Sequence, residues 1–176
     1  MDPALYTAIG ALIVALLGGL FQLYQARISR VVELKAELAQ EALRSYRQGL
    51  IEVCSSLLGF QDQLNLISKA EGARLSVKYR EELHRARDEV MDSVRANHVT
   101  FPKEFRVLLL DARERCADIV LALELEGVWK GDHVKLEPGQ VGRVRNVMVE
   151  LGMIHQRLLA ADISYSERVL RRIGGE

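Results

Sequence analysis

An uncharged stretch near the start of the chain constrains its fold more than any other feature. No Asp, Glu, Lys or Arg occurs from Pro3 to Ala26. A helix of this length, at 1.5 Å per residue, extends about 36 Å, and a hydrocarbon layer is about 30 Å thick. The apolar side chains would surround this helix instead of forming one stripe. The sequence therefore predicts a single transmembrane helix over residues 1–28.

The charges that flank this stretch predict its orientation. Only Asp2 and the amino terminus precede it, whereas Arg27, Arg30 and Lys35 follow it as a cytoplasmic basic anchor. Basic residues beside a membrane helix favour the cytoplasmic side, so we expect the N-terminus outside and the C-terminal body in the cytoplasm. The stretch lacks a basic start and a small-x-small cleavage site, so it does not resemble a cleaved signal. A buried hydrophobic helix of a soluble protein is the alternative.

Small residues recur along one face of the predicted helix. The stripe consists of Ala4, Ala8, Ala11, Ala15 and Gly18, and the same alternation of four and three continues to Gln22 and Gln25. In lipid, small side chains let helices approach closely, so several copies could assemble on this face. Gln22 and Gln25 would then form polar rings at the cytoplasmic mouth of a bundle or narrow pore. In the alternative interpretation, the stripe is a chance pattern on a simple anchor.

The remainder, residues 29–176, has helical periodicity throughout and predicts an all-α fold. The first helix continues to about residue 70, and turns are expected over 71–76 and 97–105. A long loop is expected over 127–140, before a fourth helix over 141–173. The expected inward-facing residues of the second helix are Leu75, Tyr79, Leu83, Ala86, Val90 and Val94, and those of the third are Phe105, Leu108, Leu109, Ala112, Cys116, Ile119 and Leu123. Short connections between long amphipathic helices favour a cytoplasmic antiparallel four-helix bundle.

The body carries no recognisable catalytic motif. It has no glycine-rich phosphate loop, no HExxH and no GxSxG. Cys54 and Cys116 are expected to be buried apolar residues, and the four histidines are not spaced as metal ligands. Lys and Arg balance Asp and Glu at 24 each, which argues against a broad nucleic-acid-binding field. We therefore predict no enzyme activity, catalytic residue, metal or cofactor.

One span leading directly into a four-helix body, with the turn "VTFPKEF" between the second and third helices, resembles small phage-defence membrane proteins of bacteria. The family it resembles is the accessory membrane protein of type VI-B CRISPR systems, which implies a divergent HEPN-like bundle and a membrane pore. HEPN ribonucleases use an Arg and a His on one helix. The nearest matches here are Arg80 with His84, Arg95 with His98, and Arg145 with His155, and none has that family's interval.

Three hypotheses of function follow. In the first, the chain is an oligomeric effector of the bacterial inner membrane that forms a pore or perturbs the bilayer in antiphage defence. In the second, it is a membrane-anchored helical adaptor that binds a cytoplasmic protein. In the third, it is a HEPN-type RNase. The expected partners are the lipid bilayer and further copies of the chain, with a cytoplasmic defence protein or an RNA or nucleotide signal as the activator.

Overall fold

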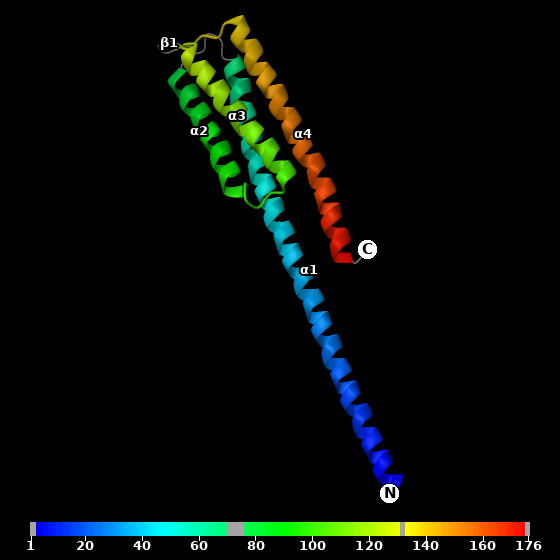
Figure 1. Cartoon of the computed structure of the whole chain (residues 1–176). Coiled ribbons are helices and arrows are strands. Elements are labelled where there is room, and N and C mark those ends of the chain that lie inside the picture. The colour runs from blue at the N-terminus through cyan, green and yellow to red at the C-terminus, as the bar shows by residue number, and fades with distance from the viewer. Residues whose placement is uncertain (1–2, 70–75, 131–132, 175–176) are drawn as a thin grey trace.

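The computed structural model describes residues 3–69, 76–130 and 133–174, with the side chains of the first helix described from Ala15 onward. It contains helices α1 (Pro3–Lys69), α2 (Ser76–Asn97), α3 (Lys103–Leu125) and α4 (Pro138–Gly174). Two short antiparallel strands, β1 (Trp129–Lys130) and β2 (His133–Val134), lie between α3 and α4. Successive helices run in opposite directions in Figure 1, so the expected all-α antiparallel bundle is confirmed over these residues.

The bundle buries one continuous apolar core. Helix α1 packs against α2 and α4, and α3 packs against the same two helices, so α1 and α3 lie diagonally. Seven core residues of α1 follow one another in alternating steps of four and three, and they are Tyr46, Leu50, Val53, Leu57, Phe60, Leu64 and Ile67. This spacing places all of them on one side of the helix. That side is therefore the face of α1 that the other helices cover.

The predicted core stripes of the second and third helices are confirmed. In α2 the buried residues are Leu83, Ala86, Val90 and Val94, and Tyr79 is partly buried beside them. In α3 every residue expected inside is buried, and so are Cys54 and Cys116. Leu75, the first residue expected on the α2 stripe, lies outside the described residues.

The connections differ in detail from the expected loops. In the turn before α3, the guanidinium group of Arg106 donates hydrogen bonds to the carbonyl oxygens of Phe101 at 2.7 Å and Val99 at 3.3 Å. The expected long loop instead contains β1 and β2, and α4 begins earlier than predicted, at Pro138. Proline suits a first helical position because it lacks the N–H that would be unpaired there.

The predicted transmembrane helix over residues 1–28 is wrong. Over the residues described, no helix is both long and apolar enough to cross a membrane. Helix α1 also continues through residue 28 without a break. The division of the chain into 1–28 and 29–176 stays a prediction.

Figure 1 shows α1 extending well beyond the other three helices. Its first fully buried side chain is Tyr46, where an aromatic cluster with Phe101, Phe105 and Tyr165 closes the end of the core. We call residues 15–45 the arm. The arm has no neighbouring helix over most of its length in the described chain.

Candidate interaction surface

The arm exposes many large apolar side chains. Their exposed fractions lie between 46% and 70%, and the residues are Leu16, Leu17, Leu20, Phe21, Leu23, Tyr24, Ile28, Val31, Val32, Leu34 and Leu38. Single exposed apolar residues are common on proteins, but a contiguous run usually marks an interaction site. The arm is therefore the first candidate for a functional surface.

Within this run, one stripe continues the core face of α1. We call Leu17, Phe21, Tyr24, Ile28, Val31, Lys35 and Leu38 the arm stripe. Beyond Leu38, the residues at steps of four are Ala42, Tyr46 and Leu50. Over the whole run from Leu17 to Leu50, the average step is therefore close to the 3.6 residues per turn of a straight helix. The arm stripe therefore leads toward the side of α1 that the bundle buries beyond Tyr46. Just before Tyr46, however, Ala42 is exposed and the half-buried residues are Ala36, Ala39 and Leu43, on a neighbouring side of the helix. Beyond the bundle, the arm stripe has no cover in the described chain.

The stripe of small residues predicted from the sequence lies on another side of α1 from the arm stripe, since Ala15 is about 200° around the helix from Leu17. Ala15, Gly18, Gln22 and Gln25 are exposed, and no atom lies within 4 Å of a Cβ added at Gly18. Ala4, Ala8 and Ala11 fall outside the residues whose side chains are described. A strict 3.5-residue period drifts about 20° per heptad around a straight helix, so the small stripe turns away from the core face along the arm. Its role in packing or pore lining stays a prediction.

The basic residues predicted as an anchor are all on the arm. Arg27, Arg30 and Lys35 are exposed, and Lys35 belongs to the arm stripe itself. Their charges separate an uncharged part of the arm, from Ala15 to Ala26, from a charged part that continues to the bundle. The predicted positions on the cytoplasmic side of a membrane stay a prediction.

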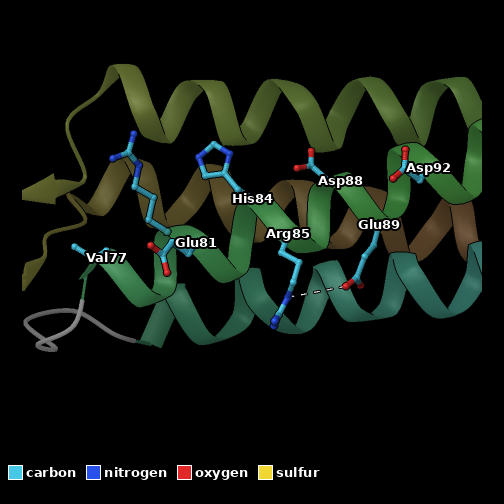
Figure 2. Close-up of a pocket in the computed structure, with 8 residues that line it drawn as sticks. Val77, Glu81, His84, Arg85, Asp88, Glu89 and Asp92 are labelled. Carbon is cyan, nitrogen blue, oxygen red and sulfur yellow. Dashed lines mark ion pairs between the residues drawn. The ribbon is translucent and has the colours of Figure 1, made fainter.

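A second candidate surface is a hollow along α2, with a volume of about 670 Å³. Figure 2 shows that the side chains around it all project from α2, and that Arg85 pairs with Glu89 at 4.0 Å. The lining residues are Val77, Arg80, Glu81, His84, Arg85, Asp88, Glu89 and Asp92. Both signs of charge occur on this surface, which is typical of a solvated helix face.

The best-defined polar cluster of the α2 surface joins it to α3. Glu124 accepts hydrogen bonds from Nε of Arg80 and pairs with Nε2 of His84, each at 2.8 Å, while its other oxygen lies 2.7 Å from the Arg80 guanidinium. Partial burial alone would raise the pKa of Glu124, but the hydrogen bonds and charges of Arg80 and His84 outweigh it and hold that pKa below 4.5. The hydrogen bond that Arg80 donates to Glu124, together with the charge of that carboxylate, in turn raises the pKa of Arg80.

This cluster gives a structural role to the Arg80 and His84 pair. The sequence analysis missed Glu124, because it lies 40 residues from His84 on another helix. Glu124 of α3 contacts both side chains of α2, so the cluster links the two helices. The carboxylate of Glu124 also balances the charge of the Arg80 guanidinium. Such a contact is typical of a half-exposed ion pair in a helical bundle.

In the described part of the chain, the other histidines lie on separate elements. His98 follows α2, His133 is on β2 and His155 is on α4. Among the residues described, no three His, Cys, Asp or Glu side chains lie close enough to hold a metal ion. Burial raises the pKa of the Cys116 thiol to about 12, and burial together with the charge of Asp162 raises that of Cys54 to about 11. Neither thiol is therefore poised as a nucleophile.

No protein-family model, curated protein or solved structure matches this chain. The resemblance to the accessory membrane protein of type VI-B CRISPR systems, and the HEPN-like description of the bundle, therefore stay predictions. Of the surfaces described above, only the arm combines large exposed apolar side chains with a regular helical spacing.

Proposed function

We propose that this protein is a non-catalytic assembly protein whose copies associate through the arm stripe. The observation that carries the proposal is the exposed continuation of the core face of α1 beyond its partner helices. Residues Leu17 to Leu38 of this stripe alternate in steps of four and three. That is the spacing with which two helices interlock their side chains.

The size of the apolar surface supports association. Complete burial of a Leu, Ile, Val or Phe side chain contributes about 1.5–3 kcal/mol. At roughly 25 cal/mol for each Å² removed from water, this corresponds to on the order of 100 Å² of apolar surface for each side chain. With about half of each side chain exposed, the arm presents several hundred Å² of apolar surface. Each partner in a standard protein interface contributes roughly 800 Å². The arm alone therefore supplies a large part of what a stable interface needs.

Catalysis has less support from the described residues. His84 and Arg80 are both held by Glu124, and the remaining histidines lie on separate elements. The pore and membrane-effector hypothesis required a transmembrane helix, and it is not carried forward. What remains of it is the expectation that copies of the chain assemble.

A pair of matched substitutions tests the proposal. Ile28 and Ala26 are both exposed on the arm and lie two residues apart, about 200° around the helix. Ile28→Glu puts a carboxylate into the arm stripe, whereas Ala26→Glu adds the same charge on the opposite face. We expect the purified full chain to associate reversibly, and Ile28→Glu to weaken this by more than about tenfold, or 1.4 kcal/mol.

Sedimentation velocity over a range of concentrations measures this association. Ala26→Glu should behave as the unaltered chain does. Circular dichroism of each variant checks that the bundle remains folded. A full chain that stays monomeric at high concentration would contradict the proposal, and the adaptor hypothesis, with a different protein on the arm, would replace it. Equal effects of the two substitutions would also contradict it.

A further inference from the structure

We propose that the arms pair in parallel and in register, so that the bundles of all copies lie at one end of the assembly. This inference rests on the self-association proposed above. It concerns which residues of two copies face each other, and it follows from how charge is distributed along the arm.

Charge divides the arm into two halves. No charged residue occurs from Ala15 to Ala26, where Leu, Phe and Tyr side chains are 59–70% exposed. The charged residues all occupy the half nearer the bundle, and they are Arg27, Arg30, Glu33, Lys35, Glu37, Glu41 and Arg44. Each half therefore has its own requirement, because the first must be covered by apolar surface and the second must keep its charges hydrated or paired.

An antiparallel pair meets neither requirement. When two arms overlap fully in opposite directions, the uncharged half of one lies along the charged half of the other. Side chains such as Phe21 would then cover charged groups, and removing a charge from water without a partner is costly. In a parallel pair the uncharged halves cover each other, and the charged halves remain together near the bundles.

Lys35 supports the same orientation. It is the one charged member of the arm stripe and lies between Val31 and Leu38. In a parallel, in-register pair Lys35 faces its own copy, and its long side chain can extend sideways to water. A single Lys at such a position fixes register at some cost in stability. In an antiparallel pair it would instead face the apolar end of the partner arm.

Disulfide trapping tests the orientation. Tyr24 and Leu38 are both on the arm stripe and 14 residues apart, which is about 21 Å along the helix. We expect Tyr24→Cys and Leu38→Cys, made as separate single variants, each to form a disulfide-linked dimer under mild oxidation. A disulfide requires Cα atoms about 4.4–6.8 Å apart. Two positions so far apart can both meet their own copies only when the arms are parallel and in register.

Controls separate this inference from the proposed self-association. Ala26→Cys, on the opposite face, should give no linked dimer, and the buried native thiols Cys54 and Cys116 should not contribute. Sedimentation checks that each variant still associates, and Leu17→Cys with Val31→Cys provides a second pair at the same separation. Linkage at one position of a pair, or at neither, in variants that still associate would overturn the parallel arrangement. A full chain that is monomeric would instead overturn the self-association itself.

Discussion

Asn97 at the end of α2 packs directly against Gly49 in the middle of α1. A Cβ added at Gly49 would lie 2.8 Å from Cγ of Asn97 and would also collide with its Oδ1 atom. Asn97 is held there because its amide donates hydrogen bonds to the carbonyl oxygen of Ser93 at 2.9 Å and to Glu52 at 3.3 Å. The absence of a side chain at Gly49 therefore lets the end of α2 approach α1.

Two glycine substitutions on α1 should change stability in opposite directions. Gly49→Ala forces Asn97 to move, and such overpacking lowers the free energy of unfolding by about 1–3 kcal/mol. The greater helix preference of Ala offsets about 0.5–1 kcal/mol of this loss. Gly59 has no atom within 4 Å of an added Cβ. Gly59→Ala should therefore stabilise the fold by about 0.5–1 kcal/mol. Thermal unfolding measures both, at about 2–4 °C per kcal/mol.

A double variant checks that the contact with Asn97 causes the loss. Asn97→Ala removes the atoms closest to the added Cβ, so the cost of Gly49→Ala should be smaller in that background, and the two effects should not add. If Gly49→Ala costs the same with and without Asn97, the close contact between α1 and α2 is not the cause.

The contact of Glu124 with Arg80 and His84 predicts a pH dependence of stability. Because the pKa of Glu124 is lowered in the folded chain, its ionised form stabilises the fold at pH values above 4.5. This contribution is lost as the pH falls through the folded-state pKa. Glu124→Gln should therefore lower the urea midpoint at pH 7, and the difference from the unaltered chain should be smaller at pH 3.

A control substitution removes the same charge from the same surface. Glu81 is exposed on the α2 hollow, and Glu81→Gln should change the urea midpoint little at either pH. If Glu124→Gln and Glu81→Gln have the same pH profile, the general loss of a negative charge explains the effect. The ion pair between α2 and α3 would then contribute nothing measurable, as many half-exposed pairs do.

The two cysteines should resist alkylation while the chain is folded. Their pKa values are raised to about 11 for Cys54 and about 12 for Cys116, chiefly by burial, and the thiolate is the reactive form. At pH 8 we expect iodoacetamide to modify neither within an hour, but to modify both in guanidinium chloride. Mass spectrometry measures the number of added groups. Rapid modification of the folded chain would show that one of these helices opens.

The core of the body could be predicted from the sequence because helical spacing decides which side chains face inward. All seven residues expected on the inner face of α3, from Phe105 to Leu123, are buried. Periodicity alone was sufficient at these positions, since each helix has one covered face.

Other features could not be predicted, for physical reasons. An uncharged helix with apolar side chains all round must be covered, but its sequence does not say whether lipid or protein covers it. Strands β1 and β2 have two residues each, too few for an alternating pattern. Glu124 could not be paired with His84 by spacing, because packing of two helices brings them together. The packing role of Gly49 could not be predicted either, since the contact with Asn97 depends on tertiary structure.

The last prediction distinguishes the arm stripe from the small stripe on another side of the arm. Phe21 and Gln22 are neighbours on the arm and project about 100° apart. In water, burial of large apolar side chains drives association, whereas close packing of small residues is the usual means in lipid. Phe21→Ala should therefore weaken self-association by roughly 10–100-fold, since burying Phe contributes about 1.5–3 kcal/mol. Gln22→Ala should leave it almost unchanged.

One further substitution tests directly whether the small stripe is the contact face. Ala15→Leu would separate the arms if Ala15 were at their contact. On the arm stripe interpretation Ala15 lies about 200° from Leu17, away from the interface, and the substitution should weaken association less than threefold. Sedimentation velocity of Phe21→Ala, Gln22→Ala and Ala15→Leu, at matched concentrations, measures all three. If Ala15→Leu and Gln22→Ala weaken association more than Phe21→Ala does, the contact face is the small stripe, because only a close approach of the two backbones makes those positions sensitive.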